Sequence, residues 1–247
     1  LHVFRASNES TQYLRITSTG TVLKGLTTAR QNYSNNTSGV EYGFQIESTT
    51  ATKSSLSLIR SSNDENDGGI FIGKTRSTSV GGNTVVQAGD DLGTITFGGA
   101  DGTSLLFGAE IIAEVQSGVG NDDMPTDLIF KTNGGSTSTA ERLRITSDGE
   151  IQCRGAADNK GFGVYISSTQ KVAELIEHSN DGELRLYTGN ATPLLKTVIT
   201  SYGNSYINAA STNLFGVGTD SPEGKIHIVA NTDPALKIEA KPVSAST

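Results

Sequence analysis

The commonest pattern along the chain is a short run of alternating apolar and polar residues that ends in a turn. In residues 13–17, Leu14 and Ile16 fall on one face and Arg15 and Thr17 on the other, and Ser18-Thr19-Gly20 follows as a turn. A period of two bounded by Gly, Asn, Asp and Ser predicts a β-strand. Further runs of this kind predict strands at 43–48, 56–60, 70–73, 92–97, 128–131, 143–146, 162–167, 183–187, 194–200 and 225–229.

Two segments need a choice between helix and strand. In residues 109–115, Ala109, Ile111, Ala113 and Val115 alternate with more polar neighbours, and glycines at 108 and 118 bound the run. Residues 171–177 also alternate. Since period two favours a strand over a helix, we predict an all-β fold without an amphipathic helix.

The strand patterns recur in the same order in two parts of the chain. Leu14-Arg15-Ile16-Thr17-Ser18-Thr19-Gly20 returns as Leu143-Arg144-Ile145-Thr146-Ser147-Asp148-Gly149. The other matches are 42–48 with 161–167, 62–64 and 69–73 with 179–186, and 1–3 leading to 14–16 with 226–228 leading to 236–238. The repeats predict four modules: 1–75, an inserted module 76–140, 141–213, and a further cassette or connector 214–247.

Single strands and turns cannot each bury a separate core, so such repeats must stack on one another or on partner chains. The chain is polar, with 34% hydrophobic and 6% aromatic residues, and it contains 29 glycines. We therefore expect an elongated body in which several copies supply the missing core and pair the edge strands.

Three segments resemble bacteriophage tail-fibre proteins, especially those of phages that infect aquatic bacteria, including cyanophages. They are 140–149 (AERLRITSDG), 215–228 (FGVGTDSPEGKIHI), and the inserted module with 92–102, 109–115 and 121–132. The resemblance implies an intertwined homotrimeric fibre built of small β-sandwich, β-prism or β-helix-like modules. It also implies that such fibres often continue into a C-terminal chaperone that trimerises the chain and is cleaved off.

The function that the resemblance implies is structural. We expect a non-enzymatic, trimeric shaft or host-attachment segment in the tail fibre of a virion. Its partners would be its own copies, other tail or baseplate proteins, and a host surface polysaccharide or outer-membrane receptor. The alternatives are a fibre attached to the capsid or baseplate, a glycan-depolymerising tailspike, and a bacterial β-repeat adhesin.

Charge and composition argue against several other classes. The formal net charge is −7, and the scattered Lys and Arg residues form no basic stripe, so a nucleic-acid partner is not expected. The single cysteine, Cys153, excludes an internal disulfide framework, and we read it as a packed or idle thiol. No apolar run approaches the length of a membrane helix, so we expect no membrane insertion.

Candidate chemistry is sparse. No nucleophile elbow, phosphate-binding loop or dinucleotide fingerprint occurs, and we predict no catalytic residue and no cofactor. The acidic run from Asp64 fails as a calcium loop, because Gly68 stands at its fifth position and Thr75 at its twelfth. It is more typical of a solvated hairpin loop, although paired carboxylates there or near Asp122 would suit glycan hydrolysis.

The three histidines predict no metal site. His2 and His227 each lie between apolar residues, so both should face solvent if their neighbours face the core. The alternative is a threefold axis on which three copies bind an ion. His178 is expected at a strand end, and no zinc spacing is present.

Long loops are where receptor binding would reside. The loops at 62–69, 76–90 and 117–126 are our candidates. The candidate receptor-facing residues within them are Asp64, Glu65, Asn66, Asp67, Asn121, Asp122 and Asp123.

Overall fold

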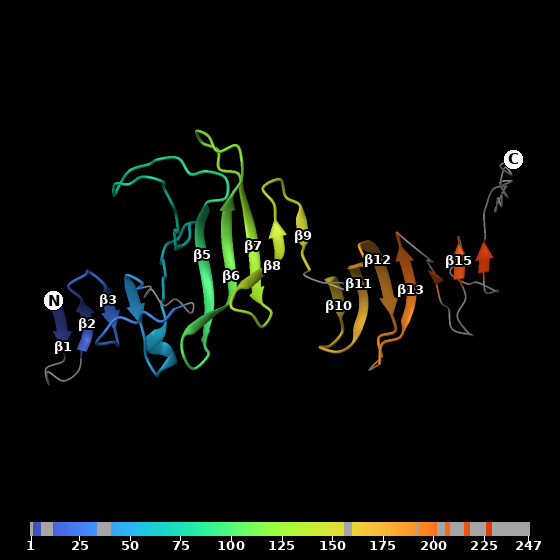
Figure 1. The fold of residues 1–247 in the computed structure, drawn as a ribbon, viewed down its shortest axis with the longest axis horizontal. Helices are drawn as coiled ribbons and strands as arrows, with labels where there is room; N and C mark the ends of the chain where they lie inside the picture. Colours follow the sequence, from blue (N-terminus) through green and yellow to red (C-terminus); the bar gives the residue numbers. More distant parts are fainter. Residues whose placement is uncertain are drawn as a thin grey trace. The chain divides into compact units, whose positions relative to one another are not determined.

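The computed structural model describes residues 2–5, 12–33, 41–155, 160–190, 192–201, 206–207, 215–217 and 226–228. Across these ranges the chain forms β-sheets, and the short 3-10 helix η1 (Ala51–Ser54) is the one helical element found there. The all-β prediction is therefore confirmed. The chain divides into two compact units, Leu1–Arg154 and Gly155–Thr247 (Figure 1).

Two sheets make up the first unit. The smaller has the order β1 (His2–Arg5), β2 (Gln12–Ile16), β3 (Val22–Lys24) and β4 (Phe44–Ile46); β3 and β4 run parallel and the other pairs antiparallel. The larger is an antiparallel meander of β5 (Asp91–Ala100), β6 (Leu105–Val115), β7 (Thr126–Asn133), β8 (Thr139–Ile145) and β9 (Ile151–Cys153). Strand β6 confirms the strand predicted at 109–115. Strand β8 crosses residue 140, so the predicted inserted module and the second LRITS motif share one sheet.

The second unit carries another antiparallel meander. Its strands are β10 (Gly161–Tyr165), β11 (Lys171–His178), β12 (Asp181–Tyr187), β13 (Leu195–Thr200) and β14 (Tyr206–Ile207). A separate parallel pair joins β15 (Phe215–Val217) and β16 (Ile226–Ile228). Strand β11 confirms the strand at 171–177, and His178 ends it as expected. Ser179 and Asn180 form the two-residue turn to β12, with φ values of 56° and 68°, the conformation that matches the twist of a tight hairpin.

The LRITS repeat is one hairpin built twice. Ile16 pairs with Val22 in the first copy and Ile145 with Ile151 in the second. In both turns the threonine amide donates to the carbonyl four residues on, at 2.9 Å, from Thr17 to Thr21 and from Thr146 to Glu150. Each turn also needs a left-handed residue, and Gly20 (φ 89°) and Gly149 (φ 92°) supply it without a Cβ clash.

The similarity extends upstream of the hairpin. Strands β1 and β2 pair with an irregularity between Phe4 and Arg5, and β7 and β8 pair with one between Phe130 and Lys131, at the same distance from the turn. The sequences HVFR and LIFK occupy equivalent positions. The β1–β3 arrangement thus repeats that of β7–β9. The sequence pattern predicts a different repeat, in which residues 1–3 correspond to residues 226–228.

Two predicted strands are wrong. Residues 56–60 and 70–73 belong to no strand. The side chains of both segments are exposed, and those of Ile59 and Phe71 are 84% and 96% exposed. An alternating segment can form a strand, but a strand also needs a neighbour for its backbone, and these segments have no ladder partner among the residues that the structure describes.

One face of the large sheet of the first unit is covered by charged side chains. Ile112, Ile129 and Arg144 lie in one cross-strand row, so they share this face. Arg144 donates to Asp127 at 2.6 Å, to Glu141 at 2.8 and 2.9 Å and to Glu114 at 3.0 Å. Ile112 and Ile129 are only 4% and 1% exposed on this face, and the aliphatic parts of long charged side chains can cover apolar neighbours in this way.

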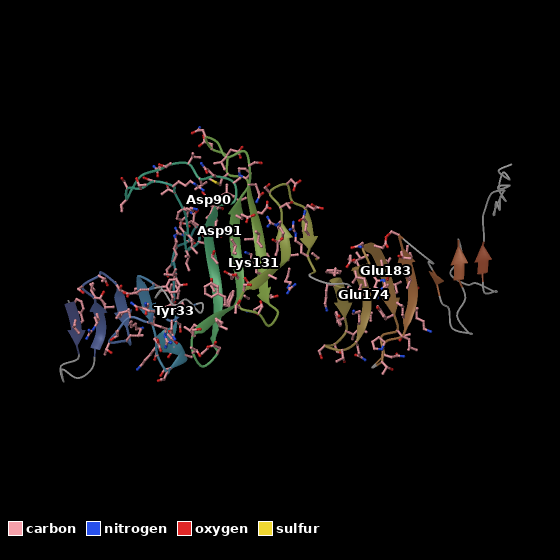
Figure 2. The ribbon with its side chains drawn as sticks, viewed as in Figure 1. Tyr33, Asp90, Asp91, Lys131, Glu174 and Glu183 are labelled. Carbon is pink, nitrogen blue, oxygen red and sulfur yellow. The ribbon has the colours of Figure 1, made fainter. Side chains whose placement is uncertain are left out.

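The sheet of the second unit repeats this design. Glu174, Arg185 and Val198 share a cross-strand row, and Glu174 and Val198 are buried. Burial alone would raise the pKa of Glu174, but Lys171, the Tyr187 hydroxyl and Arg185 outweigh it, so the pKa is lowered. Arg185 also donates to Glu183 at 2.5 Å (Figure 2). In both units, therefore, a small apolar core lies beneath an ionic network.

Replacing Arg144 by Met should destabilise the first unit. Asp127, Glu114 and Glu141 would keep their charges without the cation, and breaking a buried pair in this way costs about 3–5 kcal/mol. The neighbouring Arg142→Met removes the same charge outside the network and should cost less than about 1 kcal/mol. Urea unfolding at one fixed protein concentration measures both, and equal losses would contradict the role given to Arg144.

Glu174 should make stability depend on pH. Its pKa in the folded state is below the ordinary value of 4.5, so its contribution is complete above that pH and is lost as the pH falls through the folded-state pKa. Glu174→Gln should therefore lower the melting temperature at pH 7, and the difference from the native protein should shrink below pH 4.5. Glu177→Gln on the same strand is the matched control. A difference that persists unchanged in acid would contradict this assignment.

Candidate functional site

An open cleft lies in the first unit between the segment that precedes β5 and the loop between β6 and β7. Its volume is about 500 Å³, within the range of small-ligand sites. The lining residues are Lys74, Thr75, Asn83, Thr84, Val85, Val86, Val119, Gly120, Asn121 and Met124. The structure thus brings together two of the three loops singled out from the sequence, 76–90 and 117–126.

Asp90 holds one wall of the cleft in place. This buried carboxylate accepts hydrogen bonds from Lys74 at 2.6 Å, from Arg76 at 2.7 and 2.9 Å, and from the Gln87 amide at 3.0 Å. Arg76, Lys74 and the Gln87 amide together hold its pKa well below the usual range. The Asp90 carbonyl in turn accepts from the Val115 amide at 2.8 Å. The wall is therefore fastened to the end of β6, beside the start of β5 (Figure 2).

The opposite wall is a tight turn. The Gly120 amide donates to the Asp123 carbonyl at 3.1 Å, and the Asp123 amide donates back at 3.3 Å. Asp122 has a φ of 58°, and its carboxylate accepts from the Asn121 amide group at 3.0 Å. Of the three residues predicted here, Asn121 lines the cleft, whereas Asp122 and Asp123 are exposed beside it.

The lining chemistry suits a neutral polar ligand with an apolar face. Asn83, Asn121 and two threonines offer amide and hydroxyl groups, while Val86 is buried and Met124 is 48% exposed. The Lys74 ammonium already binds Asp90. A sugar ring presents this combination of hydroxyls and an apolar face. None of the lining residues is a carboxylate, so this cleft lacks the acid pair that glycoside hydrolysis uses.

The third predicted loop, 62–69, does not line the cleft. Asp64 accepts from Arg60 at 2.5 and 2.7 Å, from Ser62 at 2.6 Å and from the Asn66 amide at 3.0 Å. Arg60 above all, then Ser62 and the Asn66 amide, lower the pKa of Asp64. Asp64 therefore organises its own loop, on which Glu65, Asn66 and Asp67 are exposed. Over the described ranges, no cluster of His, Cys, Asp and Glu is placed to hold a metal ion.

A second candidate surface is the apolar face of the large sheet of the first unit. Cross-strand pairing places Ile95, Ile111, Phe130 and Leu143 in one row, on the face opposite Arg144. Ile95, Phe97, Leu128 and Ile151 are 50%, 56%, 38% and 68% exposed on this face. At the Gly93 end, Ile72 comes close, with its Cγ2 2.3 Å from where a Cβ on Gly93 would stand, and Val115 on the same face is fully buried. Away from this end, much of the face is exposed among the described residues.

The sheet of the second unit leaves the same kind of face open. Phe162, Leu175, Leu184 and Ile199 form one row, and Val164, Ala173 and Leu186 form the next. Phe162, Leu175 and Ile199 are 57%, 56% and 53% exposed. Each large sheet thus has one face covered by its own charged side chains and one apolar face that the described residues leave largely exposed.

The remaining reactive side chains form no site within the described ranges. His178 Nδ1 lies 3.4 Å from a Glu183 carboxylate oxygen at the end of β11. Cys153 is exposed on β9 rather than packed. The side chains of His2 and His227 lie outside the described residues.

Comparison with protein-family models and with curated proteins finds no match for this chain. Among the residues that the structure describes, no helix has the length and apolar character to span a membrane.

Sequence reasoning missed two features of these surfaces. It did not identify Asp90 as an anchor, although two cations at Lys74 and Arg76 precede it in a segment with few other charges. It also did not separate the two faces of each sheet. The alternation along β12 contained part of that signal, because Glu183 and Arg185 fall on the side opposite Leu184 and Leu186.

Asp90→Asn should loosen the wall of the cleft. The neutral amide cannot hold both Lys74 and Arg76, so the hydrogen bonds between this segment and the end of β6 should open more often. We expect faster hydrogen exchange at the Gly89 and Val115 amides. Asp91→Asn, the adjacent exposed carboxylate, removes the same charge and is the control. Unchanged exchange in Asp90→Asn would contradict the anchoring role.

Proposed function

We propose that this chain is a non-enzymatic structural segment of a bacteriophage tail fibre, a shaft or host-attachment element made of three copies. In this proposal it acts in the virion, beside other tail or baseplate proteins. The observation that carries the proposal is the pair of open apolar sheet faces, one in each unit.

A chain with these faces is incomplete alone. Among the described residues, seven apolar side chains are buried, whereas twenty-four large apolar or aromatic ones are exposed. Soluble monomers rarely expose a contiguous apolar patch of more than a few hundred Å². Further copies that cover these faces would gain roughly 25 cal/mol for each Å² of apolar surface removed from water.

The identity of the fibre rests on the sequence motifs. The LRITS hairpin occurs twice with one geometry, and a regular, repeated hairpin is what a shaft assembled from repeats requires. The motifs at 140–149 and 215–228 resemble those of phage tail fibres. Three copies is the number that this resemblance implies.

The cleft is the proposed contact for the host surface. Its amides, hydroxyls and apolar floor suit one sugar unit of a surface polysaccharide, with Asn83 and Asn121 on opposite walls. Binding without cleavage fits a lining that has no carboxylate, so a fibre is favoured over a depolymerising tailspike for this site.

Light scattering on the native chain should give about three times the 25.8 kDa chain mass. Ile95→Lys should break this assembly, because the charge would be buried between copies, although in one copy Ile95 is half exposed. The control is Thr94→Lys, one residue away on the charged face, which should keep the native mass. A native protein that is a stable monomer, with a circular dichroism spectrum of folded β-sheet, would sink the proposal.

A further inference from the structure

Residues 56–60 have a strand-like alternation, but in the described part of the chain their backbone pairs with no strand. In the described part, no hydrogen bond between backbone groups involves residues 56–73. Leu56, Leu58 and Ile59 are 64%, 53% and 84% exposed. The C-terminal end of the segment is fixed, because the Arg60 side chain donates hydrogen bonds to Asp64 and, at 2.8 Å, to the Asn66 carbonyl. Gly68 lies beside it, since a Cβ there would stand 3.6 Å from the Arg60 backbone nitrogen. We call residues 56–60 the arm, because they alternate like a strand but belong to no sheet.

The second unit contains the same segment in a paired state. Ser62-Asn63-Asp64 corresponds to Ser179-Asn180-Asp181, which aligns Leu58 with Leu175 and Leu56 with Ala173 on β11. There, Leu175 pairs with Phe162 of β10, and Ala173 pairs with Val164. The repeat therefore identifies the neighbour that residues 56–60 lack, namely the counterpart of β10.

That counterpart is β4. Gly43-Phe44 aligns with Gly161-Phe162, which places Phe44 at the position of Phe162 and Ile46 at that of Val164. Strand β4 is the last strand of its sheet, so no described strand pairs with its outer edge, and Phe44 is 58% exposed. An arm and an edge that pair in one repeat thus occur unpaired in the other.

The outer edge of β4 and the paired edge of β10 present their backbone hydrogen-bonding groups at equivalent positions. The Val22 amide donates to the Gly43 carbonyl at 2.9 Å and the Glu47 amide to the Lys24 carbonyl at 3.0 Å, so these groups face β3. By alternation, the backbone groups of Phe44 and Ile46 face outward. In the second unit the Glu177 amide donates to the Lys160 carbonyl at 3.4 Å, which makes Phe162 and Leu175 a hydrogen-bonded pair. Phe44 offers its amide and carbonyl at the matching position.

The connection explains why the pair does not close within one chain. In the second unit, residues 166–170 form a tight turn in which the Ile166 amide donates to the Gln170 carbonyl at 2.9 Å. The first unit has residues 47–55 instead, which include η1, and Lys24 of β3 donates to the Lys53 carbonyl at 3.2 Å. Between the aligned positions the connection has nine residues in the first unit (47–55) and eight in the second (165–172), so the two connections differ in conformation more than in length.

We propose that residues 56–60 of one copy add an antiparallel strand to the open edge of β4 in a second copy, with Phe44 opposite Leu58 and Ile46 opposite Leu56. This inference rests on the proposed function, since it needs a multi-copy assembly. It explains the two exposed sets of apolar side chains together, because the pairing sets Phe44 beside Leu58 as Phe162 lies beside Leu175. It also removes an open edge that would otherwise recruit other chains.

Disulfide cross-linking between differently tagged copies tests the pairing. Both chains carry Cys153→Ser, one carries Phe44→Cys and the other Leu58→Cys, and they are co-expressed and mildly oxidised. Cα atoms of a hydrogen-bonded antiparallel pair lie about 5.5 Å apart, within the range that a disulfide spans. We expect a covalent dimer that contains both tags. Ile59→Cys in place of Leu58→Cys points to the other face and should give at most about a tenth of that yield.

A second pair, Ile46→Cys with Leu56→Cys, should cross-link in the same way. It keeps the test valid if a variant of the first pair fails to fold. If light scattering shows a trimer but neither pair cross-links between copies, the strand addition is wrong while the fibre proposal stands. A disulfide formed only within one chain, in a Phe44→Cys/Leu58→Cys double variant, would likewise overturn it. A monomer without cross-links would overturn both proposals.

Discussion

Every β-sheet has two faces, and in this chain each large sheet covers only one of them with its own side chains. Arg144 in the first unit and Arg185 in the second bind several carboxylates across the strands, and a few aliphatic side chains on the same faces are buried. The opposite faces carry the larger apolar residues, many of which are exposed among the described residues. The need to cover these faces constrains how the molecule assembles, because an apolar sheet face is stable in water only when another surface packs on it.

Ion pairs and apolar contacts contribute to the stability of a sheet in different ways. Ion pairs that are hydrogen-bonded on several sides fix the register of neighbouring strands, because a shift of one residue would move every charge to the other face. Apolar contact is not directional and provides most of the free energy of association. A sheet with one face of each kind can therefore define its own strand order as a single chain and still depend on other copies for much of its stability. This arrangement fits a subunit that folds locally and is completed by assembly.

The repeats show how one local design is used in different surroundings. The LRITS hairpin keeps its turn, its glycine and its upstream irregularity in both copies, so these features depend on residues close together in sequence. Residues 56–60 and 173–177 share a pattern, yet only the latter are in a sheet. The difference lies in the conformation of the connections, which form a tight turn at 166–170 in one case and include a 3-10 turn at 51–54 in the other. The cleft depends on neither the hairpin nor these connections. Asp90 lies outside the strand pairing, and its hydrogen bonds fasten the wall of the cleft to the end of β6.

The sequence by itself determined where most strands lie, the all-β class and the doubled hairpin. All three follow from period-two alternation and turn residues, which act over a few positions. Alternation alone also assigns Arg144 and Leu143 to opposite faces of one strand, because successive side chains in a strand point to opposite sides. Only the tertiary structure decided which strands pair, that 56–60 and 70–73 remain unpaired, and that loops 76–90 and 117–126 meet at a cleft while 62–69 does not. Those outcomes depend on groups far apart in sequence, such as Asp90 with Lys74 and Val115, whose approach is set by how the whole chain packs.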